Sequence, residues 1–431
     1  MTRIRSVPTQ ENRVALVLLV PQMAIAVGAL LVNVFSARAL GPSGRGALAL
    51  HLQLTYIITV VVLLGRDRSY LATIGQLASP DRATQQSRDL LRLPLVLALV
   101  TAVAAGLAFA APTPMWTAAL AAGYLLVITG NMMSRVSRSA AITAVHPWPF
   151  ARAVLASQIL LVAVSVALLV LRIDRLEVWF VAYGLTLALP FLCQLVAAGP
   201  NRSLDGRERE QNRAARRLGL RLVPSQVGEM ALLRADRLLI PLLSSYYQLG
   251  IYVVAATMAE LASWPLSQYI DSHTPRWREE FEARTISPWR ILRQTSIFSL
   301  LISVAVAVPA YLAIPLLFGS EYRAAAALIP LLSVATALFA VSRVVVALTT
   351  VADLTRWASL VNGAGVASSL GLCVLLVPRH GALGASYASL VAYGVCAVIG
   401  LGGVLRVAQE LRALPPDSTR ARTTEEMGCT R

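Results

Sequence analysis

Polar and charged side chains recur at helical spacing inside one long apolar segment, residues 219–243. Gln226 and Glu229 lie three residues apart, and Asp236 follows seven residues later, so the three fall along one helical face with Arg237 beside them. A charge at the centre of a bilayer costs roughly 2.5–3.5 kcal/mol on insertion scales, so such residues usually face a cavity or one another. The stripe predicts either a polar transport pathway or a local acid–arginine pair that only fixes helix packing.

The next apolar segment, residues 249–270, carries Glu260 near its middle. A carboxylate at that depth could couple transport to a cation, H⁺ or Na⁺, or it could be a neutral structural acid with a hydrogen-bond partner. In the first apolar segment Asn33 shares a helical face with Gln22 and Ser36. We therefore count Glu260 and Asn33 among the candidate pathway residues.

Four arginines lie at the ends of apolar segments. Arg135 and Arg138 follow the segment 115–134 on one face, and Arg66 and Arg68 stand in the run Gly-Arg-Asp-Arg-Ser-Tyr. Because a guanidinium group binds phosphate through two parallel hydrogen bonds, these arginines could steer a diphosphate at the cytoplasmic mouth of a pathway. The alternative is ordinary anchoring by positive residues at the cytoplasmic membrane boundary.

The elements that must position these residues are membrane-spanning helices. The chain has 431 residues, 57% hydrophobic and 14% charged, against about 25% charged in an ordinary soluble domain. Its apolar runs are continuous, whereas strands of a membrane barrel alternate, so the predicted fold is an all-α integral membrane protein with about twelve transmembrane helices. The predicted spans are 14–36, 47–65, 93–112, 115–134, 150–171, 178–199, 219–243, 249–270, 291–318, 324–351, 357–377 and 382–405.

The distribution of arginine sets the predicted orientation. With the N-terminus in the cytoplasm, inside loops and the tail hold about fourfold more arginine than outside loops, as the positive-inside rule requires. Both termini are therefore predicted to be cytoplasmic. The net charge of +16 follows from this topology, so it gives no support for nucleic-acid binding. The outside loops hold only Arg38, Arg45, Arg172, Arg175, Arg323 and Arg379.

A polar segment near the middle divides the chain into two sets of six spans. We predict an N-terminal bundle over 1–199, a cytoplasmic linker over 200–218, a C-terminal bundle over 219–405 and a disordered cytoplasmic tail over 406–431. The halves share a weak repeat, because a short outside turn with a glycine, Gly46 or Gly250, opens the second helix of each half. Such internal symmetry is typical of transporters with a site between the halves.

Enzyme signatures are absent from the sequence. It contains no Gly-rich phosphate loop with lysine, no His-Glu-x-x-His pair and no nucleophile elbow, and its four histidines are scattered. We predict no enzymatic activity, no cofactor and no metal site. Any transport would draw on an ion or substrate gradient, since no ATPase domain is present.

Four motifs together resemble one family. They are FSARALGPSGRGALAL at 35–50, RADRLLIPLLSSYYQLGIYVVA at 234–255, IPLLFGSEYRAAAALIPLLS at 314–333 and VNGAGVASSLGLCVLLVPRHGALGASYASLVAY at 361–393. They are similar to the helix-boundary motifs of the polysaccharide and lipid-linked oligosaccharide flippases, a branch of the multidrug/oligosaccharidyl-lipid/polysaccharide (MOP) exporter superfamily, and they occur in the same order.

This resemblance implies two six-helix bundles in a V that move polyprenyl-diphosphate-linked oligosaccharide by alternating access. It also implies a multi-pass protein of the bacterial cytoplasmic membrane in cell-surface polysaccharide synthesis, such as O-antigen or capsule, with membrane lipids and a coupling cation as partners. Cationic cavities are frequent in the family, whereas the mid-membrane charges placed here are largely acidic. Two alternatives are a cation-coupled multidrug antiporter of the same superfamily and a membrane glycan polymerase or ligase.

Overall fold

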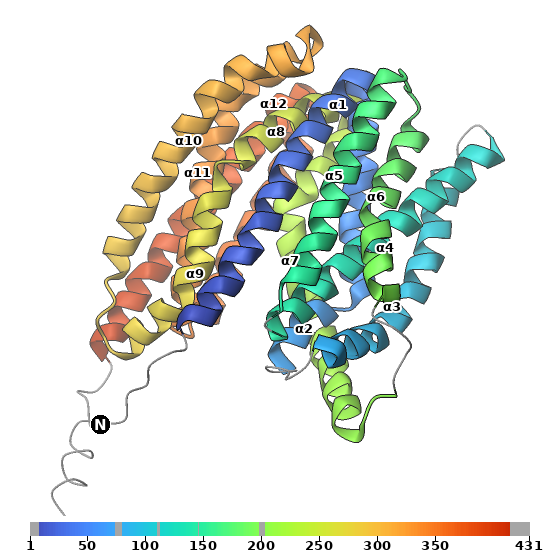
Figure 1. The fold of residues 1–431 in the computed structure, drawn as a ribbon. Coiled ribbons are helices and arrows are strands. Elements are labelled where there is room, and N and C mark those ends of the chain that lie inside the picture. The colour runs from blue at the N-terminus through green and yellow to red at the C-terminus, as the bar shows by residue number, and fades with distance from the viewer. Residues whose placement is uncertain (1–7, 74–79, 110–112, 145, 198–202, 414–431) are drawn as a thin grey trace, which may run out of the picture. The chain divides into compact units, whose positions relative to one another are not determined.

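The computed structural model describes residues 8–73, 80–109, 113–144, 146–197 and 203–413, and within these ranges the regular elements are all helices (Figure 1). In chain order they are α1 (Pro8–Leu63), α2 (Arg66–Thr73), α3 (Pro80–Ala108), α4 (Pro114–Thr143), α5 (Trp148–Val170), α6 (Leu176–Ala197), α7 (Gly206–Leu243), α8 (Tyr246–Glu260), α9 (Ser263–Glu282), α10 (Pro288–Phe318), the 3₁₀ turn η1 (Ser320–Tyr322), α11 (Arg323–Val351) and α12 (Thr355–Ala413). The predicted all-α class is confirmed.

Two of these helices are too long for a single membrane crossing. The apolar part of α1, Val20–Leu63, has 44 residues, which would extend about 66 Å at 1.5 Å per residue, twice the roughly 30 Å hydrocarbon layer. A glycine breaks each helix: Gly41 in α1 has φ 65° and Gly381 in α12 has φ 54°, both in the left-handed region that favours glycine. Each long helix therefore has the length and the break for two crossings, at the positions predicted from the sequence.

Eight helices in the described part of the chain are long and apolar enough to span a membrane, which supports a multi-pass membrane protein. The two broken helices count once each among these eight. By this criterion α7, α8 and α9 are not among them, since α7 and α9 are rich in charge and α8 has only 15 residues. The predicted total of twelve spans and the cytoplasmic placement of both termini stay predictions.

The predicted linker 200–218 contains the beginning of a regular helix. Asp205 is the N-cap of α7: its Oδ1 accepts from the Glu208 backbone N–H at 2.7 Å, and the Glu208 side chain accepts from the Asp205 N–H at 2.9 Å. This reciprocal capping box satisfies two amides that a helix start otherwise leaves without acceptors. Helix α7 then runs unbroken through the rest of the predicted linker into the seventh apolar segment.

The chain forms two compact units. The first takes in the described residues of Met1–Met258, Val308–Ile329 and Ser369–Ala388, and the second those of Ala259–Ala307, Pro330–Ser368 and Ser389–Arg431. The division into bundles over 1–199 and 219–405 stays a prediction.

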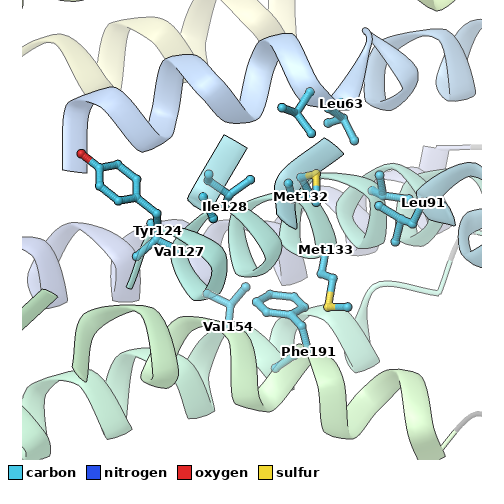
Figure 2. Packing of buried hydrophobic residues seen from close by; sticks show 14 of the residues in the cluster. Leu63, Leu91, Tyr124, Val127, Ile128, Met132, Met133, Val154 and Phe191 are labelled. Carbon is cyan, nitrogen blue, oxygen red and sulfur yellow. The ribbon is translucent and has the colours of Figure 1, made fainter. Parts of the chain in front are cut away.

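Helix α4 forms the centre of the first unit, where it packs against α3 and α6. Figure 2 shows side chains of α4 directed to both sides, with Met132 toward Leu63 of α1 and Met133 toward Phe191 of α6. Such packing matters more in a membrane than in water, because surrounding lipid is as apolar as the core itself. The second unit has its own core, in which Val344 and Leu348 of α11 lie with buried aromatic and aliphatic side chains of α9.

The glycines of the weak sequence repeat face each other in the first unit. A Cβ placed on Gly46 would meet the carbonyl oxygen of Tyr246, four residues before Gly250, and a Cβ on Gly250 would meet the carbonyl oxygen of Pro42, four residues before Gly46. The contact is therefore reciprocal, as expected where two related turns pack about a local twofold axis. Small residues at such contacts let helix backbones approach closely.

We predict that Gly46→Ala destabilises the protein by about 1–3 kcal/mol, the cost of forcing a methyl group into a filled space. The opposing atoms belong to backbone and cannot rotate away. The measurement is the apparent melting temperature of the purified, detergent-solubilised protein. Gly228→Ala is the control, because a Cβ on Gly228 in α7 meets nothing within 4 Å. Equal melting temperatures for Gly46→Ala and the wild type would contradict the close contact.

Candidate functional site

A buried guanidinium group lies beside the break in α1. Because the chain folds back at Gly41, Arg45 returns along the preceding helix, and its Nε donates to Asn33 Oδ1 at 2.8 Å. The Arg45 residue is only 7% exposed and Asn33 only 4%. The Nη1 of Arg45 is also buried, and it has no hydrogen-bond acceptor in the described part of the chain. The charge distribution places Arg45 in an outside loop; the structure has it in helix α1 with a buried side chain, and its position on the outside stays a prediction.

The Asp236 carboxylate accepts hydrogen bonds from two donors, one on α8 and one on the next residue of α7. Its Oδ2 accepts from the Tyr252 hydroxyl, and its Oδ1 accepts from the Arg237 backbone N–H at 2.7 Å. Asp236 and Arg237 are both buried. Asp236 and Tyr252 stand about equally far from the turn at Ser244 between α7 and α8, so antiparallel packing of these helices brings them together. A carboxylate with these donors is anchored rather than available to a cation.

Gln226, on the same helix α7, is buried, and neither its Nε2 nor its Oε1 has a partner among the described residues. Buried amides in proteins normally have partners, so a lone one points to water or a ligand at that place. The side chain of Glu229 lies outside the described part of the structure. Glu260 ends α8 in the second compact unit and is half-buried.

Arg45 lies near other polar groups of the first unit. Arg237 of α7 is close enough to repel its charge, and the hydroxyl-bearing side chains of Tyr183 and Tyr322 are also nearby. The structure therefore brings Asn33, which was predicted as a pathway residue, together with Arg45, which was not. Tyr252 and Arg45 are the residues that sequence patterns missed. The hairpin between α7 and α8 could have indicated Tyr252, whereas an arginine in a Gly- and Pro-rich turn gives no sign that it will be buried.

The predicted phosphate-steering arginines divide into two kinds. Arg135 Nε of α4 forms an ion pair with Asp67 Oδ2 of α2 at 2.8 Å, and Ser139 Oγ donates to the Asp67 carbonyl at 2.9 Å. Arg138 and Arg68 lie exposed on the surface. Arg135 is thus fixed in place, while Arg138 and Arg68 face outward.

Arg66 has a structural partner. It donates to the carbonyl of Leu90, which would otherwise pair with the amide of residue 94, and residue 94 is a proline that has no N–H. Burial lowers the pKa of Arg66 to about 10, with a smaller contribution from nearby Arg216 and an opposing one from Asp89. The group still carries its positive charge at neutral pH.

A cavity of 360 Å³ opens inside the first unit among α3, α4, α5 and α6. Its lining mixes apolar side chains such as Met133 and Phe191 with polar ones such as Ser87 and Gln194. Gln194 Oε1 is buried there without a donor among the described residues. No group of histidine, cysteine, aspartate or glutamate in the described part of the chain is arranged to hold a metal ion.

Solved structures with the same fold are membrane transporters of the MOP superfamily. The chain is similar to an inward-facing multidrug resistance MATE family transporter, with a TM-score of 0.67 and 14% identity over 93% of this chain and 100% of the other. It is similar to the lipid II flippase MurJ in an inward closed conformation, with a TM-score of 0.64 and 10% identity over 92% of this chain and 91% of the other.

A third similar structure is a multidrug resistance MATE family transporter in an outward-facing conformation, with a TM-score of 0.52 and 14% identity over 94% of this chain and 97% of the other. Neither a protein-family model nor a functionally curated protein matches the sequence. At these identities the likeness establishes the fold. It is shared by a lipid II flippase and by multidrug transporters, so the fold does not choose between these cargoes.

We predict that Asp67→Asn destabilises the protein by about 1–3 kcal/mol, because it leaves the Arg135 guanidinium without its counter-charge in a largely buried place. Arg135→Gln alone should cost a similar amount. The double variant should cost clearly less than the sum, as measured by a double-mutant cycle on melting temperatures in detergent. Additive effects would show that the pair does not contribute to stability.

Proposed function

We propose that this protein is an alternating-access transporter that moves a lipid-linked oligosaccharide across the bacterial cytoplasmic membrane for cell-surface polysaccharide synthesis. The observation that carries the proposal is the buried guanidinium of Arg45, which has one donor without an acceptor in the described part of the chain. A buried donor of positive charge favours an anionic cargo, and a diphosphate offers the acceptors that match it.

The balance of buried charge favours this cargo over a lipophilic cation. With histidine counted as neutral, the buried charged residues of the described part of the chain are three arginines and two aspartates. Both aspartates already accept hydrogen bonds, Asp67 Oδ2 from Arg135 and Asp236 from Tyr252, although Asp67 Oδ1 has no partner among the described residues. A multidrug antiporter would need a carboxylate available to its cationic substrate. The three arginines are Arg45, Arg66 and Arg237.

Each remaining candidate has a proposed role. Arg135 and Arg66, with the exposed Arg138 and Arg68, would steer the diphosphate at the cytoplasmic mouth, where Arg135 would exchange the Asp67 carboxylate for phosphate. Asn33, Gln226, Asp236 and Arg237 would line the pathway, and Glu229 and Glu260 would couple transport to the cation. The fold shared with MOP transporters supports alternating access. A gradient would drive it, because the sequence carries no signature of an ATPase.

In cells that depend on this protein, we expect Arg45→Gln to reduce surface glycan at least tenfold and to make lipid-linked oligosaccharide accumulate. A hydrogen bond to a charged group contributes about 1.5–3 kcal/mol, which corresponds to that loss. The readouts are glycan display and extracted lipid-linked sugar at matched protein levels. Arg323→Gln is the control: it removes one exposed arginine, also predicted to lie outside. Normal export by Arg45→Gln would refute the proposed role, and resistance to cationic dyes without a glycan phenotype would favour a multidrug antiporter.

Cation coupling has a separate test. We expect Glu229→Gln or Glu260→Gln to lower export and to weaken its dependence on an imposed H⁺ or Na⁺ gradient, because each change removes a titratable oxygen while it preserves side-chain size. The measurement is transport of lipid-linked sugar in vesicles of defined gradient. If both variants export normally at normal protein levels, the coupling role of these acids fails, while the cargo assignment stands.

A further inference from the structure

A second cavity, of 430 Å³, lies between α3 and the beginning of α7, and two of its lining residues, Asp89 and Arg216, are close enough to Arg66 to interact with its charge. Both elements belong to the first compact unit. The cavity is at the start of the apolar span of α3, on the side that the arginine distribution predicts to be cytoplasmic. Its lining residues are Gln85, Asp89 and Arg92 of α3, Ser203 and Leu204 before α7, and Arg209, Arg213 and Arg216 of α7.

The acidic residue of this lining is already neutralised. Asp89 Oδ2 accepts from Arg216 Nη2 at 2.5 Å and from Asn212 Nδ2 at 2.9 Å, and its Oδ1 lies 3.9 Å from Arg92 Nε. Four arginines therefore line the cavity with a single carboxylate, whose one negative charge is already paired with Arg216. The cavity keeps a clear excess of positive charge.

Two arginines of α7 point their unused donors into this space. Arg209 and Arg213 are four residues apart on one helical face, and neither has an ion-pair partner in the part of the chain that the structure describes. Arg216 continues that face, and its Nε is buried without an acceptor among the described residues. Guanidinium groups that converge on a cavity with donors to spare are suited to phosphate, which they bind through paired hydrogen bonds.

An apolar track leads away from the cavity along α3. Directly after Arg92 come large apolar side chains that are about half exposed or more, and they recur on the face that carries Arg92. A lipid with its phosphate among the arginines would lay its acyl chain along this track. The exposed apolar residues are Leu93, Val96, Leu99, Val100, Val103 and Leu107.

We propose that this cavity binds the phosphate headgroup of an anionic membrane lipid, with the chain of that lipid along the exposed face of α3. Basic pockets between membrane helices on the cytoplasmic side are known to hold such headgroups. The phosphate could belong to a resident phospholipid or to a prenyl diphosphate carrier, which present the same chemistry to arginine. The site does not depend on which cargo the protein transports.

The test is native mass spectrometry of the full-length, detergent-purified protein titrated with cardiolipin, with a long-chain prenyl diphosphate and with inorganic pyrophosphate. We expect both lipids to form one-to-one complexes with the wild type, and Arg209→Gln/Arg213→Gln to weaken them at least tenfold. Both side chains are exposed, so the variant should fold, and its melting temperature checks this. The matched control is Arg290→Gln/Arg293→Gln, which removes two exposed arginines of α10.

Unchanged lipid binding by Arg209→Gln/Arg213→Gln, or an equal loss in the α10 control, would overturn the site, because the attraction would then be that of general surface charge. If pyrophosphate binds as tightly as the lipids, the proposed contact between the lipid's hydrocarbon chain and α3 would be overturned. Tighter binding of cardiolipin would assign the site to a resident lipid, and tighter binding of the prenyl diphosphate to a carrier. Arg45→Gln should retain this binding even when it fails in export, so the two proposals fail separately.

Discussion

The absence of water inside a bilayer governs this structure, because every backbone carbonyl and every buried charge must find its partner within the protein. Arginine meets much of that need. Arg38 donates to the carbonyls of Leu316 and Leu317 at the end of α10, and Arg88 donates to the carbonyl of Leu195 near the end of α6. Helix ends lack amide partners for their last carbonyls, so these guanidinium groups complete the hydrogen bonding where helices stop.

The same constraint shows which buried polar groups are held by the protein. Arg66 donates to the carbonyl that Pro94 leaves open and Asp67 Oδ2 accepts from Arg135, although Arg66 Nε and Asp67 Oδ1 are buried without a partner among the described residues. Arg45 and Gln226 keep buried polar atoms with no partner among the described residues. A membrane protein has little tolerance for such groups, which is why Arg45 and Gln226 are placed in the proposed pathway.

The internal repeat places a close backbone contact next to the buried guanidinium of Arg45. Gly46 and Gly250 meet through reciprocal backbone contacts, and Arg45 immediately precedes Gly46 in the chain. Separating those backbones would therefore change the surroundings of the buried guanidinium directly. In alternating access a site must be exposed to the two sides in turn, and a contact between small residues can separate without breaking an ion pair. The contact therefore fits the proposed function, in which Arg45 would bind the cargo.

The sequence by itself determined the helical class and the apolar segments that form the long helices, because these depend on local polarity. It predicted a turn near each break in α1 and α12 but did not identify Gly41 or Gly381 as the residue that makes it. Helix α4 begins one residue before the predicted span 115–134. Asp205 and Glu208, three residues apart, form a capping-box pattern that is visible in the sequence, and it explains why the residues after 205 are helical. Only the tertiary structure decided that Arg45 is buried against Asn33, that Asp236 is held by Tyr252, and that α3 and α7 enclose a basic cavity. These pairings join residues across turns or between distant helices, and such contacts depend on how the helices pack, which local sequence patterns do not contain.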